Sequence, residues 1–466
     1  MIWDLNAFRE NTAVITEDRE YSYGELEKMS DEFAEKTGGR TLVFIFASNS
    51  IGSLLGYVGC LNNNLVPLML DEDIDPEQRD LLIEKYQPSF IWTPEGKNIP
   101  ENGVSVFEKE GYVLYKREAG VKYDLYEELA LLIPTSGSTG SPKLVRQSYK
   151  NILANTKSIV EYLHIDSSTR SITTLPMNYV YGLSIINTHL YAGASLVLTK
   201  RTLFQKEFWQ LVKEKKVTSF GGVPYTYEML DKLRFRRMEL PDLKTITQAG
   251  GKLPVHLHEV FAEWAEENGK EFVIMYGASE ATARMSYLPP DKAVEKAGSI
   301  GIAIPGGRFE IVDDEGKTAD SPEVPGELVY YGDNITLGYA EKGEDLALGD
   351  ERNGVLHTGD RAKFDSDGYY YIVGRMKRFL KIFGNKVNLD EVDEFLKKHF
   401  DTPDIVAAGK DNDLVIFTEN AGIKDDIIPY ISHKLGLNRT AFEVRVIDKI
   451  PRNASGKILF KELEEL

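Results

Sequence analysis

The sequence contains a single cysteine, Cys60, among its 466 residues. No disulfide can form within the chain, which agrees with a reducing compartment. Cys60 lies in an apolar stretch with helical spacing, so we expect it to fill a core rather than act as a thiol. No apolar run is long enough to cross a bilayer, and the opening MIWDLNAFRE lacks the basic and apolar regions of a signal peptide. These absences predict a cytoplasmic location without a membrane span.

Positive charge is also scarce. The chain has 55 Lys and Arg against 73 Asp and Glu, a net charge of −18, which argues against nonspecific binding of nucleic acid or of anionic membranes. From residue 375 to the end, 16 basic residues balance 16 acidic ones, so the part before it carries the whole excess. The chain is too long for one compact domain. We therefore predict an N-terminal domain over residues 1–374 and a smaller C-terminal domain over residues 375–466.

Strand-like apolar runs alternate with helical patterns in the first part of the chain. We expect strands at 41–47 and 89–93 and helices at 23–36 and 50–61. Short strands and turns follow from about residue 298. The pattern predicts an α/β fold: a large multi-layer N-terminal domain with α/β subdomains and a small β subdomain, and a smaller, mobile α+β C-terminal domain.

One loop in this alternation has an unusual composition, LIPTSGSTGSPK at residues 132–143. Small residues let backbone N–H groups approach a ligand, and hydroxyls add donors that suit phosphate oxygens. The loop is not a Walker A motif, because Pro142, Lys143 and Leu144 stand where that motif needs Gly-Lys-Ser/Thr. A flexible linker is the alternative, but a linker would be out of place between a strand and a strand-helix unit. The composition indicates a polyphosphate site.

The segment TSGSTGSPK at residues 135–143 resembles the signature loop of the adenylate-forming superfamily, which includes acyl-CoA synthetases, peptide-synthetase adenylation domains and firefly luciferase. Five further segments resemble motifs of that superfamily in the same order. They are NSIGSLLGYVGCLNNNLVPLML, YGASE at 276–280, GVLHTGD at 354–360, GRMKRFLKIFGNKVNLDEVD at 374–393 and PRNASGKI at 451–458. The resemblance covers most of the chain from about Tyr21, and Ser279 replaces the threonine that is usual in the second of these.

The resemblance implies an enzyme that joins a carboxylic acid to the α-phosphate of ATP, releases pyrophosphate, and passes the acyl group to a thiol. ATP, Mg²⁺ and coenzyme A, or a carrier-protein phosphopantetheine, would be its cofactors. A carboxylate must approach a polyanion, so positive charge and oriented donors are needed. Lys457 is implied as the catalytic ammonium and Glu280 as the ligand of Mg²⁺. The resemblance makes Lys377 the hinge, and Gly384 would leave room for a pantetheine arm.

The implied nucleotide site draws on both predicted domains. Lys143 would either neutralise the phosphates or anchor the loop, and Tyr276 offers an aromatic face to adenine. Asp360 can accept hydrogen bonds from the ribose hydroxyls, and Arg375 adds a donor. A glycine pair in QAGGKLP lets the backbone pass close to the base. The full set is Thr135, Ser136, Gly137, Ser138, Thr139, Gly140, Lys143, Gly250, Gly251, Tyr276, Gly277, Ala278, Ser279, Asp360 and Arg375.

The acyl site is expected in LPMNYVYGLS and GGVPYTYEML, which match the family segments that line it. Asn178 stands where a histidine is frequent, and MNYVY lacks the aspartate that would pair with a substrate amine, so an α-amino acid is disfavoured. Tyr181, Val223, Ala249 and Ala278 would give a mostly apolar pocket, with Asn178 as a polar contact. A small or medium carboxylic acid, aryl or acyl, is the expected substrate.

Several alternatives remain open at this level. The acceptor is either coenzyme A or the phosphopantetheine of an acyl or aryl carrier protein. An amino-acid-type adenylation enzyme and luciferase-like oxidation are weaker readings of the same resemblance. A catalytically silent nucleotide-binding module would lose Lys457 or Glu280, and both are present. The chain ends about nine residues after Lys457, which favours a stand-alone ligase.

Overall fold

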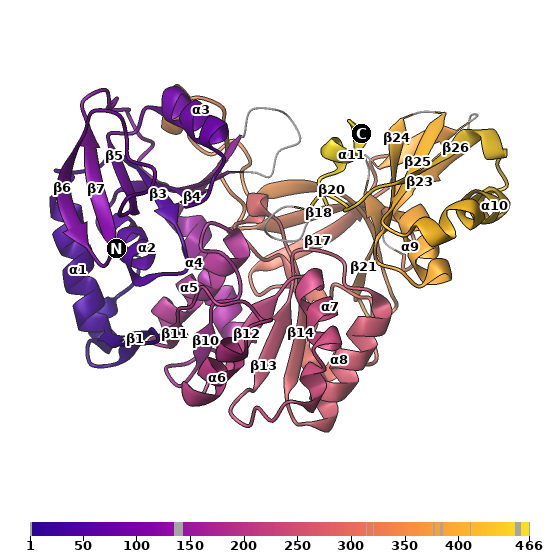
Figure 1. The fold of residues 1–466 in the computed structure, drawn as a ribbon, viewed down its shortest axis with the longest axis horizontal. Coiled ribbons are helices and arrows are strands. Elements are labelled where there is room, and N and C mark those ends of the chain that lie inside the picture. Colours follow the sequence, from indigo (N-terminus) through magenta and orange to yellow (C-terminus); the bar gives the residue numbers. More distant parts are fainter. Residues whose placement is uncertain are drawn as a thin grey trace. The chain divides into compact units, whose positions relative to one another are not determined.

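The computed structural model describes residues 2–134, 143–313, 315–319, 321–375, 378–382, 385–410, 412–452 and 458–465. The chain packs into two compact units (Figure 1). The first unit is Met1–Arg308 with Tyr331–Leu356, and the second is Phe309–Tyr330 with His357–Leu466. These units are defined by packing. The predicted boundary at residue 375 concerns which part rotates, and it stays a prediction.

Two large sheets form most of the first unit in the described residues. The first sheet has parallel strands at its centre, and β14 pairs antiparallel with β15 near one edge. Because β12, β13 and β14 are parallel, their carboxyl ends meet at one edge of the sheet, where ligands commonly bind. In spatial order the strands are β16 (Ile302–Ala303), β15 (Ser286–Tyr287), β14 (Glu271–Tyr276), β13 (Thr245–Gln248), β12 (Ser219–Gly222), β10 (Arg170–Ile172), β11 (Ser195–Val197), β1 (Thr12–Ile15) and β2 (Glu20–Ser22).

The second sheet has a parallel centre of β8, β4, β3 and β5, and antiparallel strands at both edges. The predicted strands at 41–47 and 89–93 are confirmed as β3 and β5. In spatial order the strands are β19 (Gly338–Ala340), β9 (Leu144–Ser148), β8 (Leu129–Pro134), β4 (Val66–Asp71), β3 (Leu42–Ala47), β5 (Phe90–Pro94), β7 (Tyr112–Arg117) and β6 (Gly103–Lys109).

Four helices pack between these sheets and share one apolar core with both. They are α1 (Tyr23–Glu35), α2 (Ile51–Asn62), α4 (Tyr149–Tyr162) and α5 (Val180–Ala192). The hydroxyls of Ser22, Ser50 and Ser148 accept backbone N–H bonds at the first turns of α1, α2 and α4, which fixes where those helices begin. The helices predicted at 23–36 and 50–61 are confirmed. Cys60 is fully buried on α2, and burial raises the pKa of its thiol, as expected for core filler.

The remaining helices of the first unit cover the outer faces of the sheets. Side chains of α3 (Pro76–Tyr86) pack with the second sheet in a separate core. Helices α7 (Pro224–Lys232) and α8 (Val255–Glu267) pack on β12 and β14 (Figure 1), and α6 (Lys206–Glu214) precedes β12. Each of the latter three lies between consecutive parallel strands, as the α/β alternation requires.

The second unit combines a four-stranded sheet, in which β20 and β21 pair antiparallel, with a small α+β body. The sheet contains β17 (Gly307–Val312), β18 (Gly326–Gly332), β20 (Val355–Phe364) and β21 (Tyr370–Arg375). The body contains β22 (Phe379–Ile382), β23 (Asn385–Asn388), β24 (Ile405–Lys410), β25 (Asp413–Thr418) and β26 (Phe442–Val446), with α9 (Leu389–Phe400), α10 (Lys424–Leu435) and α11 (Phe460–Glu464). The apolar sides of α9 and α10 pack on one face of β24–β26, while Leu463 of α11 packs on the other.

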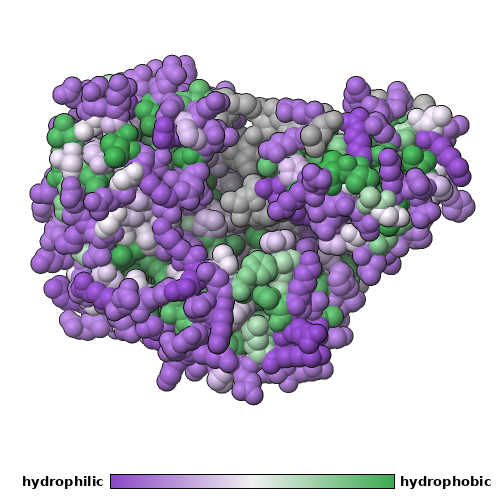
Figure 2. All heavy atoms as spheres, viewed as in Figure 1, coloured by the Kyte–Doolittle hydropathy of each residue, from purple (hydrophilic) through white to green (hydrophobic). Residues whose placement is uncertain are grey.

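The all-β packing expected from residue 298 is only partly correct. The strands β17, β18, β20 and β21 confirm it, but β16 pairs with β15 in the first sheet and β19 pairs with β9 in the second. Both are short strands whose place is set by the strand they pair with rather than by local pattern, and for β19 that partner is far away in the sequence. On the face that Figure 2 shows, hydrophilic residues cover most of the surface. No helix in the described residues is long and apolar enough to span a membrane.

Candidate active site

The YGASE motif begins at the carboxyl end of β14, where Tyr276 is the last strand residue. Gly277 follows, and its backbone lies so close to a later part of the chain that a Cβ there would sit 1.7 Å from the carbonyl oxygen of Ala283. Only glycine allows this approach. The Met285 N–H donates to the Tyr276 carbonyl over 2.8 Å. The chain from 276 to 284 therefore folds back on itself as a tight loop, called here the motif loop.

The motif loop contains a strained backbone turn. Thr282 has φ 65° and ψ −60°, and the Ala283 N–H donates to the Ala281 carbonyl over 2.7 Å. This is a γ-turn of the rare, strained type, which persists only where surrounding contacts hold it. The turn directs the short helix Ser279–Ala281, and so the Glu280 side chain.

Contacts from a segment more than fifty residues later hold this turn in place. The Asn334 amide donates to the carbonyls of Ala281 and Arg284 at 3.0 and 2.9 Å, and Thr282 Oγ1 donates to the Asn334 carbonyl at 2.7 Å. The Thr336 N–H and hydroxyl each donate to the Glu280 carbonyl at 3.0 Å. Asn334 and Thr336 are buried. Loss of either would leave buried carbonyls without donors, which is costly.

The Glu280 carboxylate is positioned from the same segment. Tyr339 Oη donates to Glu280 Oε1 over 2.7 Å, and the Arg352 guanidinium lies 4.7 Å from the Tyr339 ring centre. Burial, followed by the neighbouring Glu280 carboxylate, raises the pKa of Tyr339, so its hydroxyl remains a donor. Lys143 forms an ion pair with Glu341 at 2.5 Å and lies 5.8 Å from the same ring. Of the two roles considered for Lys143, this contact resembles an anchor.

The donor set around Glu280 fits Mg²⁺. The described residues contain no cluster of three or more His, Cys, Asp or Glu side chains that could hold a metal ion. Glu280 supplies one carboxylate, and Tyr339 occupies one of its two oxygens. Mg²⁺ commonly takes one or two carboxylates together with phosphate oxygens and water. A metal at Glu280 would therefore need a bound polyphosphate to complete its ligands.

The glycine pair lies at the neighbouring strand end. Gly250 follows β13 with φ +87°, and a Cβ there would lie 2.7 Å from Tyr179 Oη. The Gln248 amide donates to the Gly251 carbonyl over 3.0 Å, which fixes this turn. The predicted nucleotide residues 250, 251 and 276–279 thus lie at the ends of the adjacent parallel strands β13 and β14.

The residues predicted for the acyl site gather near these strand ends, but they are closely packed. Tyr181, Val223 and Ala249 are buried, at 1%, 5% and 3% exposure. Tyr181 Oη bonds to the Thr247 side chain at 2.8 Å. The side-chain oxygen of Asn178 is buried without a hydrogen-bond partner in the described residues. An acceptor of this kind suits a ligand donor.

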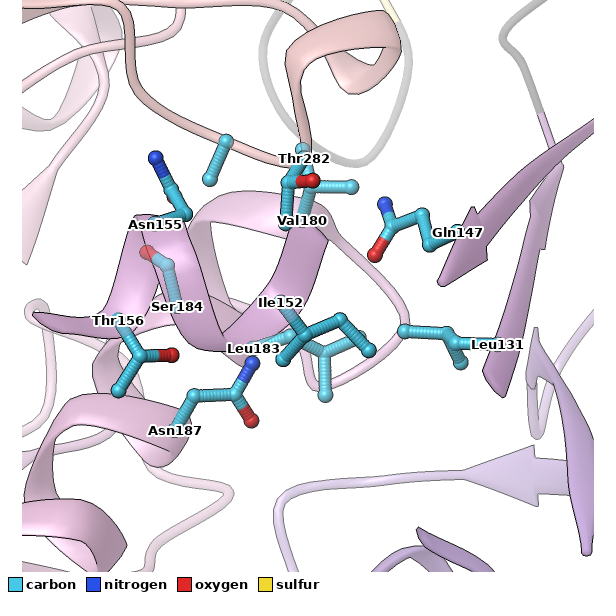
Figure 3. Close-up of a pocket in the computed structure, with 11 residues that line it drawn as sticks. Leu131, Gln147, Ile152, Asn155, Thr156, Val180, Leu183, Ser184, Asn187 and Thr282 are labelled. Atoms are coloured by element: carbon cyan, nitrogen blue, oxygen red, sulfur yellow. The ribbon is translucent and has the colours of Figure 1, made fainter. Parts of the chain in front are cut away.

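A small cavity lies beside the motif loop (Figure 3). Its volume is about 10 Å³, which is about enough for one water molecule. Gln147 extends its amide from β9 into it, Thr282 lies above, and the amide nitrogen of Gln147 has no partner in the described residues. The Gln147 amide therefore faces a water-sized space between β9 and the strained turn.

In the second unit, the two residues predicted to bind ribose meet each other. Asp360 on β20 and Arg375 on β21 are opposite in register, and Arg375 Nε lies 3.2 Å from Asp360 Oδ1. The Asp360 side chain is 11% exposed. The Thr358 hydroxyl accepts from the Asp360 N–H and donates to the Leu328 carbonyl, so the HTGD segment is fixed on the sheet.

The residues on either side of the predicted hinge share one carboxylate. Asp390 accepts from the Arg375 N–H at 2.9 Å and also from the Arg378 guanidinium. Arg378 further contacts Asp393 at 3.0 Å and the Ala407 carbonyl at 2.7 Å. Burial raises the pKa of Asp393, while the Arg378 charge opposes that shift. Arg378 therefore anchors the start of the small body.

Nine predicted site residues lie outside the described residues: Thr135, Ser136, Gly137, Ser138, Thr139, Gly140, Lys377, Gly384 and Lys457. Their roles stay predictions. Other residues were missed by sequence reasoning, among them Asn334, Thr336, Tyr339 and Arg378. The first three lie in the segment GELVYYGDNITLGY. The only feature of that segment that could have indicated a functional role is the Gly-Tyr pair at its end.

Comparison with known proteins adds to this geometry. The profile of a family described as AMP-binding enzyme matches residues 3–340. An oxalate–CoA ligase of Arabidopsis thaliana is 31% identical over 344 residues, which are 71% of this chain and 66% of that protein. A long-chain-fatty-acid–CoA ligase of Escherichia coli O157:H7 is 28% identical over 361 residues, covering 73% and 62%. The chain thus spans slightly less than two thirds of the length of these curated relatives.

Among solved structures, the o-succinylbenzoate CoA synthetase of Bacillus subtilis in complex with its acyl-adenylate OSB-AMP matches with a TM-score of 0.79. The match covers 99% of this chain and 98% of that one at 22% identity. At this identity the likeness concerns the fold. The predicted fold class is confirmed.

Proposed function

Because this chain belongs to the family of AMP-binding enzymes, we propose that it is an ATP-dependent ligase that activates a carboxylic acid and transfers the acyl group to a thiol. The observation that carries the proposal is the motif loop. It places the Glu280 carboxylate, held by Tyr339, beside the ends of β13 and β14. A carboxylate so fixed next to a glycine-rich turn suits a site for metal-bound phosphates.

Activation joins the acid to ATP. A carboxylate oxygen forms a bond to the α-phosphorus, and the bond from that phosphorus to the bridging oxygen breaks, so the electron pair leaves with pyrophosphate. Mg²⁺ bound at Glu280 would reduce repulsion between the two anions. In this proposal Lys457 supplies the ammonium that stabilises the developing charge, and the loop 135–140 holds the outer phosphates.

Transfer then moves the acyl group from the adenylate. A thiolate attacks the acyl carbon, the carbon–oxygen bond to the phosphate breaks, and AMP leaves with the electron pair. The two steps need two arrangements of the site, and we assign the change to rotation about Lys377. Asp390, which contacts both flanks of that position, supports a short pivot. Gly384 would face the pantetheine arm in the second arrangement.

The acceptor in this proposal is coenzyme A or a carrier-protein phosphopantetheine. Named relatives that act with coenzyme A favour the first. The predicted cytoplasmic location belongs to the same proposal and is consistent with one buried cysteine.

The proposal is tested with a panel of carboxylic acids in the ATP–pyrophosphate exchange assay, followed by thioester formation with coenzyme A for the acids that exchange. We expect exchange that depends on both the acid and Mg²⁺. Exchange without thioester formation would indicate that the acceptor is a carrier protein rather than coenzyme A. No exchange with any acid, with ATP still bound, would instead identify a silent nucleotide-binding module.

A further inference from the structure

A second cavity of about 350 Å³ lies in the first unit, between α4 and α5 on one side and β10, β12 and β13 on the other. This volume is within the range of small-molecule sites. Its wall combines apolar side chains, including Ile159, Ile185 and Phe220, with hydroxyl-bearing ones, including Ser171, Ser184 and Thr247. Ser184 also lines the small cavity of Figure 3, so this space adjoins the region of the motif loop.

Arg284, the last residue of the motif loop, lines this cavity and is 2% exposed. Its guanidinium lies 3.8 Å from the ring centre of Tyr181, and its Nε donates to the sulfur of Met275 at 3.3 Å. In the part of the chain that the structure describes, no carboxylate lies within ion-pair distance of Arg284. Arginine keeps its charge in proteins, and a buried charge without a counter-ion is unfavourable.

The groups around Arg284 supply no negative charge. Tyr162 and Tyr181 interact with Arg284, and burial raises the pKa of both, so both stay neutral. Asp166 and Glu271 also line the cavity, but neither forms an ion pair with Arg284 in the described residues. Asp166 accepts from the N–H and hydroxyl of Ser168 at 2.8 and 2.6 Å. Glu271 begins β14, while Met275 is near the end of that strand. The two residues are four positions apart on the strand, roughly 13 Å. The Glu271 carboxylate is occupied locally by the Thr245 hydroxyl at 2.9 Å.

The cavity extends along the strands from their amino ends, at Ser219, Thr245 and Glu271, to Gly221 and Thr247. Tyr181, on which Arg284 stacks, bonds to Thr247, and the next strand residues lead to Ala249 and Gly250 at the carboxyl end of β13. An acid whose reacting carboxylate lies at that end would direct its other end past Tyr181 toward Arg284. The apolar part of the wall accepts a short carbon chain, but the buried Arg284 charge does not suit the end of an alkyl tail and does suit a chain that ends in an anion.

We infer that Arg284 binds a second carboxylate of the substrate, so that the acid activated at this site is a short dicarboxylic acid. This inference rests on the proposed ligase function and names its substrate class. A carboxylate there would form charge-assisted hydrogen bonds with the guanidinium and would compensate its buried charge.

The test on the unmodified protein compares dicarboxylic acids with their half-amides, which keep the shape but lose the second charge. Succinate, glutarate and benzene-1,2-dicarboxylate are each paired with the half-amide and with the monocarboxylic acid of equal length. We expect kcat/KM in pyrophosphate exchange to favour the dicarboxylate by about 10²-fold or more, because the half-amide leaves Arg284 without its partner.

The same pairs are then measured with Arg284→Met, Arg284→Lys and the control Arg308→Met. Arg308 also stacks on a tyrosine, Tyr331 at 4.0 Å, but it does not line the cavity. Arg284→Met should lower kcat/KM for the dicarboxylate by about 10²-fold while the half-amide changes by less than about threefold. Arg284→Lys should lie between, and Arg308→Met should match the wild type. Near-ultraviolet circular dichroism checks folding, and the wild-type comparison stands alone if Arg284→Met does not fold.

The outcomes are distinguishable. Preference for the monocarboxylic acid, or an equal loss for both members of a pair in Arg284→Met, would overturn the inference while the ligase function stands. If none of the dicarboxylic acids, half-amides or monocarboxylic acids supports exchange, both the proposed ligase function and this inference are refuted.

Discussion

The close approach at Gly277 gives a prediction that tests the motif loop directly. In Gly277→Ala the new Cβ would lie 1.7 Å from the Ala283 carbonyl oxygen, about 1.6 Å shorter than an ordinary carbon–oxygen contact of about 3.3 Å. The obstacle is backbone, so it cannot rotate away. The loop must open by roughly that distance, which moves the strained turn at Thr282 and displaces Glu280. A displacement of about 1 Å in a catalytic group can cost about 10²-fold in rate.

We therefore expect Gly277→Ala to lower acid-dependent pyrophosphate exchange by about 10²-fold or more. Overpacking of this kind also costs about 1–3 kcal/mol of stability, which urea unfolding would measure. The matched control is Gly349→Ala, because a Cβ at Gly349 meets its nearest atoms at 3.9 Å. That variant should behave as the wild type. If Gly277→Ala keeps exchange within about threefold of the wild type, the motif loop does not position the reacting groups.

Three further predictions follow from contacts and charges described above. Tyr339→Phe removes the donor to Glu280, so we expect about a tenfold higher Mg²⁺ requirement for exchange, in line with a lost charge-assisted hydrogen bond of about 1.5 kcal/mol; an unchanged Mg²⁺ titration would show that Tyr339 does not orient the carboxylate. Burial lowers the pKa of His189 and of His258 to about 4, so between pH 6.5 and 4 the unfolded state binds protons that the folded state does not. Stability should fall as pH drops through this window, by up to about 3 kcal/mol per histidine. Urea unfolding at pH 7 and pH 5 measures the loss, and replacement of both histidines by asparagine should flatten the pH dependence. Lys457→Ala should lower adenylate formation by about 10²-fold or more while transfer from a supplied adenylate is less affected; near-normal exchange would refute its role.

Much of the fold was predictable because local pattern and tertiary structure agree. The apolar spacing predicts helices at 23–36 and 50–61, and in the structure Ser22 and Ser50 cap the helices that form there. Gly250 and Gly277 each follow a parallel strand. The α/β alternation therefore predicts that they lie at the same edge of the sheet.

The rest depended on contacts that no local pattern encodes. Strands β16 and β19 are two and three residues long and exist because of their partners. Asn334 could not be predicted as a functional residue, because an asparagine in a turn usually hydrogen-bonds within that turn. Here its amide donates to carbonyls of the motif loop instead. Arg284 carried no signal because its significance lies in the absence of a nearby carboxylate.

The dependence of the motif loop on Asn334, Thr336 and Tyr339 has a consequence for how the chain is made. While the ribosome has released only about the first 330 residues, the parallel strands β12, β13 and β14 can already pair, but the turn at Thr282 has none of these later donors to hold it. The donors that orient the Glu280 carboxylate are therefore synthesised only after β12, β13 and β14. A nascent chain stalled before residue 333 would lack all of these donors, so nothing from that segment would hold the turn at Thr282 or the Glu280 side chain in place.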